Sequence, residues 1–206
     1  MIRPMEAKDL EEVVEMHCTL IGDADLPLFG KAFMKVLYQG ILSSDFAVTF
    51  TYDDEGEVRG FIVGTTSMKQ LFSDIMRRKM ISLAHSAFFV VLMRPWLWKK
   101  AWEIMHYNKT TSMPDIEAEM PYIVLVPTTR KKGKGKALVV EVLKALQGKG
   151  IKKVKVSAHT ENDGPNRLLI AMGFHLHEKV FFLGKWQNLY WGDIDEVLSL
   201  YDSNGN

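Results

Sequence analysis

A glycine- and lysine-rich turn is the part of this 206-residue sequence best suited to binding chemistry. It runs from Arg130 to Lys136 as Arg-Lys-Lys-Gly-Lys-Gly-Lys, between an apolar segment typical of a buried strand and an amphipathic helical segment. Backbone N–H groups at such a helix start converge on one point, and the helix dipole adds about half a positive charge there. Gly133 and Gly135 allow an anion close to the backbone, because no Cβ intervenes. The turn therefore favours a phosphate or pyrophosphate ligand. Its basic side chains are those of Arg130, Lys131, Lys132, Lys134 and Lys136.

Other phosphate-binding motifs fit this turn less well. A P-loop needs Ser or Thr after its lysine, whereas Ala137 follows Lys136, and a dinucleotide fingerprint needs a third glycine where Leu138 stands. The alternative without a ligand is a solvated, lysine-rich helix start.

Glu119 is the candidate for proton transfer. Glu117 and Glu119 share one face of the strand predicted over 117–126, which is otherwise apolar and expected to be central. Desolvation there would raise the pKa of Glu119 towards neutrality, which suits a general base. The alternative is that both glutamates lie at a frayed, solvated strand start.

Two longer motifs resemble those of a known family. The run from Pro127 to Gly135, Pro-x-x-Arg-x-x-Gly-x-Gly, follows the apolar strand and resembles the acetyl-CoA motif of the GNAT superfamily of N-acetyltransferases. The run from Asn162 to Phe174, Asn-x-x-Pro-x-x-x-Leu-x-x-x-Gly-Phe, resembles that family's next motif. The predicted order of elements also matches: strand, two helices, hairpin, strand–turn–helix, strand, helix, hairpin. The resemblance covers nearly everything except 67–113.

The resemblance implies an α/β (α+β) fold. We expect a mixed, mostly antiparallel twisted sheet with helices on both faces and a V-shaped splay between two central strands. One acyl-CoA N-acyltransferase domain would cover 1–206, with 67–113 as a helical insertion near the acceptor cleft.

The resemblance also implies an activity. The chain would move an acetyl or other short acyl group from acetyl-CoA to a primary amine of a small molecule or peptide, by direct attack in a ternary complex. Glu119 lies eleven residues before Arg130, where the family often has its general base. Pantetheine would lie along Ile123, Val124 and Leu125. Pyrophosphate would sit on the N–H groups of 130–136, and Asn162 would face the pantetheine or cysteamine end.

Two positions depart from the family pattern. Leu169 stands where a tyrosine commonly protonates the departing thiolate, so the acid step has no assigned residue. Lys134 stands between the glycines, where a small or apolar residue is usual. The departure at Leu169 supports an alternative function, a catalytically weak acyl-CoA-binding sensor or scaffold.

The segment 67–113 has an unusual charge. It holds eight basic and two acidic residues, so its formal charge is +6 whereas the remainder sums to −5. Helical periodicity and the helix-breaking Pro95 predict a pair of helices there. Their apolar faces would pack on the body of the domain; the alternative is a basic, apolar surface that contacts an anionic membrane or an amphipathic substrate.

Composition bounds the remaining function classes. The chain is 47% apolar with 26 Lys+Arg against 25 Asp+Glu, which is ordinary for one globular domain. The single cysteine, Cys18, excludes a disulfide scaffold, and the absence of a signal peptide or a 20-residue apolar run favours a cytoplasmic location. Near-neutral charge and the lack of stacking platforms argue against nucleic-acid binding.

His175 and His177 lack a third ligand, so we expect no metal. Hairpin edges near the C-terminus leave a homodimer open.

Overall fold

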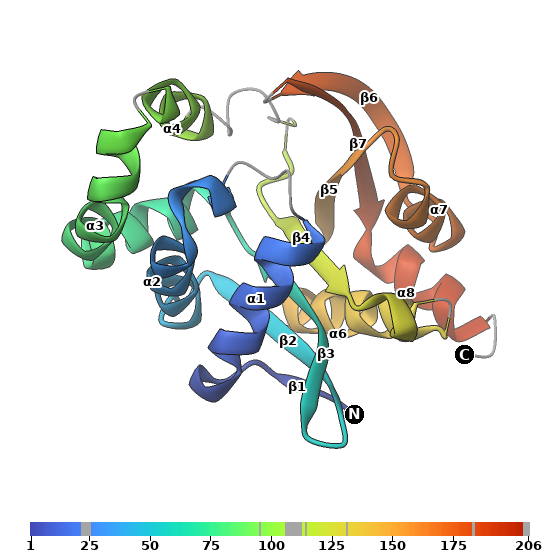
Figure 1. The fold of residues 1–206 in the computed structure, drawn as a ribbon. Helices are drawn as coiled ribbons and strands as arrows, with labels where there is room; N and C mark the ends of the chain where they lie inside the picture. The colour runs from blue at the N-terminus through green and yellow to red at the C-terminus, as the bar shows by residue number, and fades with distance from the viewer. Residues whose placement is uncertain are drawn as a thin grey trace.

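One sheet of seven strands runs through this computed structural model, which describes residues 1–21, 26–94, 96–105, 113, 115–130, 132–182 and 184–203 (Figure 1). The spatial order is β1-β2-β3-β4-β5-β7-β6, and every neighbouring pair is antiparallel except β4–β5, which is parallel. The strands are β1 (Ile2–Pro4), β2 (Ala47–Asp54), β3 (Glu57–Thr65), β4 (Glu119–Leu125), β5 (Lys153–His159), β6 (His175–Phe182) and β7 (Lys185–Asp193).

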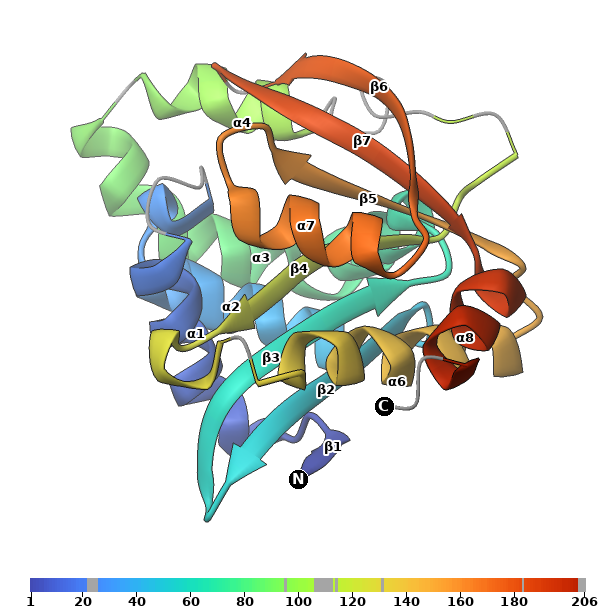
Figure 2. The same cartoon turned by 90° about the vertical axis from the view of Figure 1, so that its right-hand side faces the viewer.

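Helices cover both faces of the sheet (Figure 2). Alternation along β3 separates two apolar clusters, because successive strand residues face opposite sides. Phe61 packs with residues of α1, α2 and α3, whereas Ile62 packs with residues of α6, α7 and α8. The helices are α1 (Leu10–Leu20), α2 (Lys31–Leu42), α3 (Met68–Met93), α4 (Leu97–Met105), α6 (Lys134–Gly148), α7 (Asp163–Ala171) and α8 (Ile194–Ser203), and the 3-10 turns are η1 (Ala7–Asp9), η2 (Leu26–Phe29) and η3 (Pro127–Thr129). The predicted mixed α/β fold with two covered faces is confirmed.

The segment after the first hairpin forms the predicted helices. The first, α3, ends at Met93, two residues before Pro95, as the ring of proline requires. Figure 1 shows α4 projecting at the edge of the molecule beyond α3. Residues 106–112, near the end of the proposed insertion, and residue 114, just after it, lie outside the described residues.

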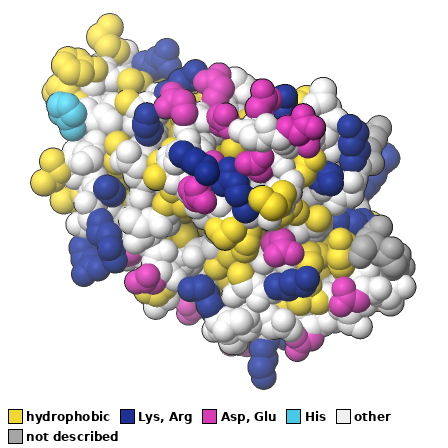
Figure 3. Space-filling model, turned by 90° about the horizontal axis from the view of Figure 1, so that it is seen from below, with side chains coloured by type: hydrophobic (Ala, Val, Ile, Leu, Met, Phe, Trp, Pro, Cys, Tyr) yellow, Lys and Arg dark blue, Asp and Glu magenta, His cyan; other side chains and the backbone are white. Residues whose placement is uncertain are grey.

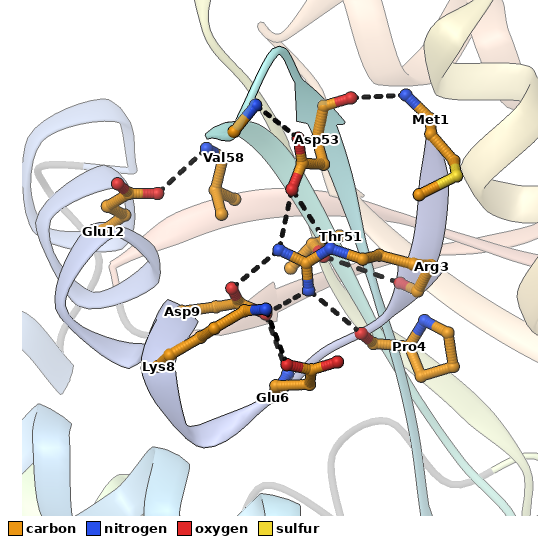
Figure 4. A network of polar contacts seen from close by, with 11 residues as sticks. Met1, Arg3, Pro4, Glu6, Lys8, Asp9, Glu12, Thr51, Asp53 and Val58 are labelled. Atoms are coloured by element: carbon orange, nitrogen blue, oxygen red, sulfur yellow. Dashed lines mark hydrogen bonds and ion pairs between the residues drawn. The ribbon is translucent and has the colours of Figure 1, made fainter.

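Arg3 joins the N-terminal strand to two other elements (Figure 4). Its guanidinium donates to both carboxylate oxygens of Asp9, at 2.7 and 2.9 Å, and to Asp53 of β2 at 2.8 and 3.1 Å. Burial alone would raise the pKa of Asp9, but the hydrogen bonds from Arg3 and from the Glu6 N–H lower it below its usual value. The hydrogen bond from Arg3 likewise lowers the pKa of Asp53. Both carboxylates are therefore ionised partners in the folded state.

Replacing Arg3 with leucine should lower the free energy of unfolding at pH 7 by about 2 kcal/mol, because a buried carboxylate loses its charged donor. Since the folded-state pKa values of Asp9 and Asp53 are depressed, the stability they add is present above their unfolded values near pH 4. It is lost at lower pH, so wild type and variant should converge towards pH 2 in urea titrations. Lys8→Ala, which removes only an exposed ion pair to Glu6, should change stability by less than about 0.5 kcal/mol. A similar loss in both variants at pH 7 would contradict this account.

Candidate functional site

The two central strands separate along their length. Between β4 and β5 the register joins Glu119 with Lys155, and the Lys155 N–H donates to the Ala118 carbonyl at 3.0 Å. Beyond this point β4 stays paired with β3 as far as Leu125, and β5 stays paired with β7 as far as His159. Figure 2 shows the two strands diverging towards their C-terminal ends. The predicted V-shaped splay is therefore present, with its narrow end at Glu119 and Lys155.

A bulge in β4 lies next to the narrow end of the splay. The register steps from Thr65↔Glu119 to Val63↔Tyr122, so β4 holds one residue more than β3 over this stretch. The extra residue bends the strand and increases its twist. Pro121 lies in the bulge and has no N–H to donate to a neighbouring strand. The bulge accounts for β4 turning away from β5 just after Glu119.

Glu119 is fully buried, and so is the side chain opposite it. The Glu119 Oε2 lies 3.4 Å from the Nζ of Lys155, with side-chain exposures of 0% and 5%. Glu117 precedes the strand and is exposed. The alternative of a solvated strand start therefore applies to Glu117 and not to Glu119. The buried carboxylate therefore lies beside the Lys155 side chain at the point where the pairing of β4 with β5 ends.

Three predicted cofactor residues lie along the diverging part of β4. Ile123, Val124 and Leu125 pair with β3 at Ile62, Phe61 and Gly60. The side chain of Val124 is buried on the α1–α2 face, whereas Ile123 and Leu125 are half-buried on the α6 face. A backbone paired on one side only can bond an extended ligand as it would another strand.

The basic turn leads directly into α6, whose N-terminus lies beside the end of β4. Gly133 precedes the helix with φ +74°, which glycine adopts without strain, and has no side chain within 4 Å of the position of a Cβ. A Cβ on Gly135 would lie 3.4 Å from Leu125 of β4 and from Leu168 of α7. The first turn of α6 is therefore held between β4 and α7. The helix starts at Lys134, so Lys134, Gly135 and Lys136 supply first-turn N–H groups that an α-helix leaves without internal partners.

The basic side chains around this turn have different surroundings. Lys132 is exposed, and the side chain of Arg130 reaches back to donate from Nε to the Leu125 carbonyl at 3.1 Å. Lys134 lies over the ring of Tyr52, with its Nζ 5.0 Å from the ring centre. Lys131 lies outside the described residues. The predicted anion site would therefore combine the N-terminus of α6 with the side chains of Arg130 and Lys136, which flank it in the sequence.

Asn162 lies across the splay, directly before α7, and its side chain is exposed. Its backbone carbonyl accepts from the side chain of Asn166 at 2.7 Å. Asn166 also accepts from the hydroxyl of Tyr190 at 2.8 Å, which ties α7 to β7. In the described part of the chain Asn162 contacts α7 and the end of β5 but not β4, so its predicted cofactor role stays a prediction.

Leu169 is buried in the apolar cluster beneath α7, with 3% of its surface exposed. The side chain at this position faces the core. The structure therefore offers no proton donor there, in agreement with the departure noted in the sequence.

Two residues of the site are not apparent from the sequence alone. Lys155 falls on the polar face of an alternating strand, and only its parallel register with β4 brings it to Glu119. Tyr52 lies eighty residues from the turn, and only the packing of β2 near the start of α6 brings it under Lys134. Among the described residues no group of three or more His, Cys, Asp and Glu side chains could hold a metal ion.

Solved structures share this architecture. The structure of SsHAT matches with a TM-score of 0.66 at 19% sequence identity, covering 94% of this chain and 98% of that one. Ard1 from Thermoplasma volcanium matches with a TM-score of 0.60 at 17% identity, covering 94% and 96%. An acetyltransferase of the GNAT family from Streptococcus pneumoniae matches with a TM-score of 0.59 at 15% identity, covering 94% and 98%. At these identities the match shows a shared fold. No protein-family model matches the sequence, and no curated protein matches it significantly.

Proposed function

Because the chain has the fold of the GNAT acetyltransferases, we propose that it is an N-acetyltransferase that moves an acetyl or other short acyl group from acetyl-CoA to a primary amine. The observation that carries the proposal is the single paired position between β4 and β5, beyond which the strands diverge beside the N-terminus of α6. Where the strands part, β4 keeps a backbone edge that β5 does not pair, and this edge could bond an extended thioester arm while the helix start takes its phosphates.

The residues of the site fit acetyl-CoA as the acyl donor. The open space at Gly133 and the first-turn N–H groups of α6 suit the pyrophosphate, with Arg130 and Lys136 adding positive charge. The one-sided pairing of Ile123 to Leu125 suits the amide groups of pantetheine. Asn162 would contact the arm from the opposite side of the splay.

The chemistry then needs one proton acceptor at the narrow end. The amine nitrogen attacks the thioester carbonyl carbon, the C–N bond forms, and the C–S bond breaks to release the thiolate. Backbone N–H groups near Ile123 to Leu125 would polarise the carbonyl oxygen. Glu119 would accept the amine proton directly or through a water. Water would protonate the thiolate, because the core-facing Leu169 cannot, and the proton on Glu119 would return to solvent.

Acetyl-CoA should raise the melting temperature of the purified chain. At about 100 times its Kd, a ligand that binds only the folded state adds about 2.7 kcal/mol, or about 5–10 °C for a chain of this size. Lys136→Glu should raise the Kd for acetyl-CoA about tenfold, because it reverses a charge at the anion site.

Lys144→Glu is the matched control, since it makes the same charge reversal at an exposed position later in α6. It should leave the Kd within about twofold. A glutamate in the first turn is favourable to the helix itself, so weaker binding by Lys136→Glu would not reflect unfolding. The absence of any shift with acetyl-CoA in the wild type would rule out the proposed donor.

The second candidate function is an acyl-CoA-binding sensor or scaffold, which the buried Leu169 favours. Both functions predict the thermal shift. Only the enzyme predicts release of free CoA thiol when a panel of primary amines is added, which a thiol reagent measures.

A further inference from the structure

The outer surface of α3 and α4 carries an unusual number of exposed apolar side chains. Its members, each more than half exposed, are Met80, Ile81, Phe88, Phe89, Leu92, Met93, Trp96, Trp98 and Trp102; we call this set the α3–α4 surface. They are nine of the fifteen large hydrophobic residues that are exposed in the described part of the chain. Scattered exposed apolar residues are normal, but a contiguous group marks an interaction site.

Packing on the body of the molecule does not account for this surface. The packed side of α3 is a separate stripe that includes Leu83 and Ala87, and Ala87 forms a small buried cluster with Phe29 and Leu97 of α4. The exposed stripe includes Ile81, Phe88 and Leu92, which recur at helical spacing on the other side. Both sides of the second half of α3 are therefore apolar, and one of them faces outward.

Exposed basic side chains lie at the junction of the two helices of the α3–α4 surface. Arg94 and Lys99 are exposed, and they lie between the end of α3 and the second turn of α4. Asp74 is one of only two acidic residues in 67–113, and it is buried and bound by Arg77 and Arg78 at 3.1 and 2.8 Å. Eight basic residues against two acidic ones in 67–113 give this segment a net positive charge, which favours an anionic partner.

The neighbouring hairpin adds to the same side of the molecule. Figures 1 and 2 both show the turn between β6 and β7 on the side where α4 lies. Phe181 and Trp186, near that turn, are exposed and contact each other edge to face with ring centres 5.4 Å apart. Figure 3, seen from below, mixes acidic and basic side chains over its centre, whereas hydrophobic side chains protrude at its left edge, the side of α3. The hydrophobic side chains at that edge protrude, as membrane-contacting residues do.

We propose that the α3–α4 surface docks this protein on an anionic lipid bilayer. A bilayer supplies both of the required properties, an apolar layer for Ile, Leu, Phe and Met and a negative surface for Arg94 and Lys99, and it needs no matching shape. Trp98 and Trp102 suit the boundary between the two, because the indole has an apolar body and one polar N–H. The contact is peripheral, since no helix in the described ranges is both long and apolar enough to cross a membrane.

The test is co-sedimentation of the full chain with vesicles of phosphatidylcholine alone and of phosphatidylcholine mixed with phosphatidylserine. At low salt the anionic vesicles should bind about tenfold more protein, and about 1 M salt should abolish the difference. Arg94→Glu/Lys99→Glu should lower the partition coefficient at least tenfold. The control Lys144→Glu/Lys152→Glu makes the same change in net charge at exposed positions elsewhere and should have little effect.

A second set of variants tests the apolar side chains of the α3–α4 surface. Phe88→Ser/Trp98→Ser should lower partitioning about tenfold, whereas Ile170→Ser, at an exposed position on α7, should not. Equal binding to both vesicle types at low salt would overturn the proposal, as would equal losses in the controls. A third outcome would also overturn the proposal. In it, the wild type does not bind vesicles but forms a dimer by light scattering, and Phe88→Ser/Trp98→Ser converts this dimer to a monomer. The acetyl-CoA thermal shift should persist in these variants, so the result stands apart from the proposed enzymatic activity.

Discussion

Replacing Glu119 with glutamine is expected to lower kcat by about 10²–10⁴-fold while the melting-temperature rise with acetyl-CoA persists. Glutamine keeps the size of the side chain but cannot accept the amine proton. Glu119 lies at the narrow end of the splay, away from the helix N-terminus proposed to bind the phosphates. Turnover by the thiol-release assay and binding by thermal shift therefore separate the proton-transfer step from donor binding.

The ion pair with Lys155 requires a control for folding. Glu119→Gln leaves the buried ammonium of Lys155 without this carboxylate, and breaking a buried pair can cost about 3–5 kcal/mol. Lys155→Met should be similarly destabilising, and the double variant Glu119→Gln/Lys155→Met should recover most of the lost stability. Recovery of stability without recovery of turnover supports the role of Glu119 as base. If the double variant recovers both stability and turnover, Glu119 has only a structural role.

The second large effect concerns His17, which is buried among aromatic rings behind β4. Its Nδ1 lies 2.7 Å from the Tyr38 hydroxyl, and its ring meets that of Tyr122 at 4.7 Å between centres. No described residue is a hydrogen-bond partner for its Nε2. Burial lowers the pKa of His17 from 6.5 to about 4, because the imidazolium would lose its hydration.

The free energy of unfolding should therefore decrease as the pH falls from 6.5 to 4. Above pH 6.5 His17 is neutral in both states and the stability is complete; below it, the unfolded chain binds a proton that the folded chain does not. The loss reaches about 3 kcal/mol near pH 4, measured as the free energy of unfolding in urea. This window lies above the one in which Asp9 and Asp53 titrate, so the two effects can be separated.

The matched variant is His17→Phe/Tyr38→Phe, which removes the titrating ring and its hydroxyl partner together, so that no buried polar group is left unpaired. Its stability should vary little between pH 6.5 and 4. His85→Gln, at an exposed position on α3, should keep the wild-type slope. An unchanged slope in the double Phe variant would show that another group titrates in this range.

The local elements of this protein follow from short-range patterns. Periodicity and glycine placement predict the strand before the basic turn, the helix after it and both hairpins, because they depend on neighbouring residues along the chain. The helix break before Pro95 follows for the same reason. One local detail differs: the helix begins at Lys134, so the second glycine of the turn lies within its first turn. First-turn residues need no hydrogen-bonded N–H, so periodicity leaves this boundary ambiguous.

The sequence by itself determined the fold class and predicted the anion-binding turn and Glu119 as the base, since each depends on residue type and spacing within one segment. Tertiary structure alone decided that Lys155 faces Glu119, that Tyr52 lies under Lys134 and that six large apolar residues of α3 face outward. The physical reason is that strand register and helix packing join residues far apart in the chain. A lysine in an alternating strand and an apolar residue on an amphipathic helix look the same in sequence whether a partner covers them or not.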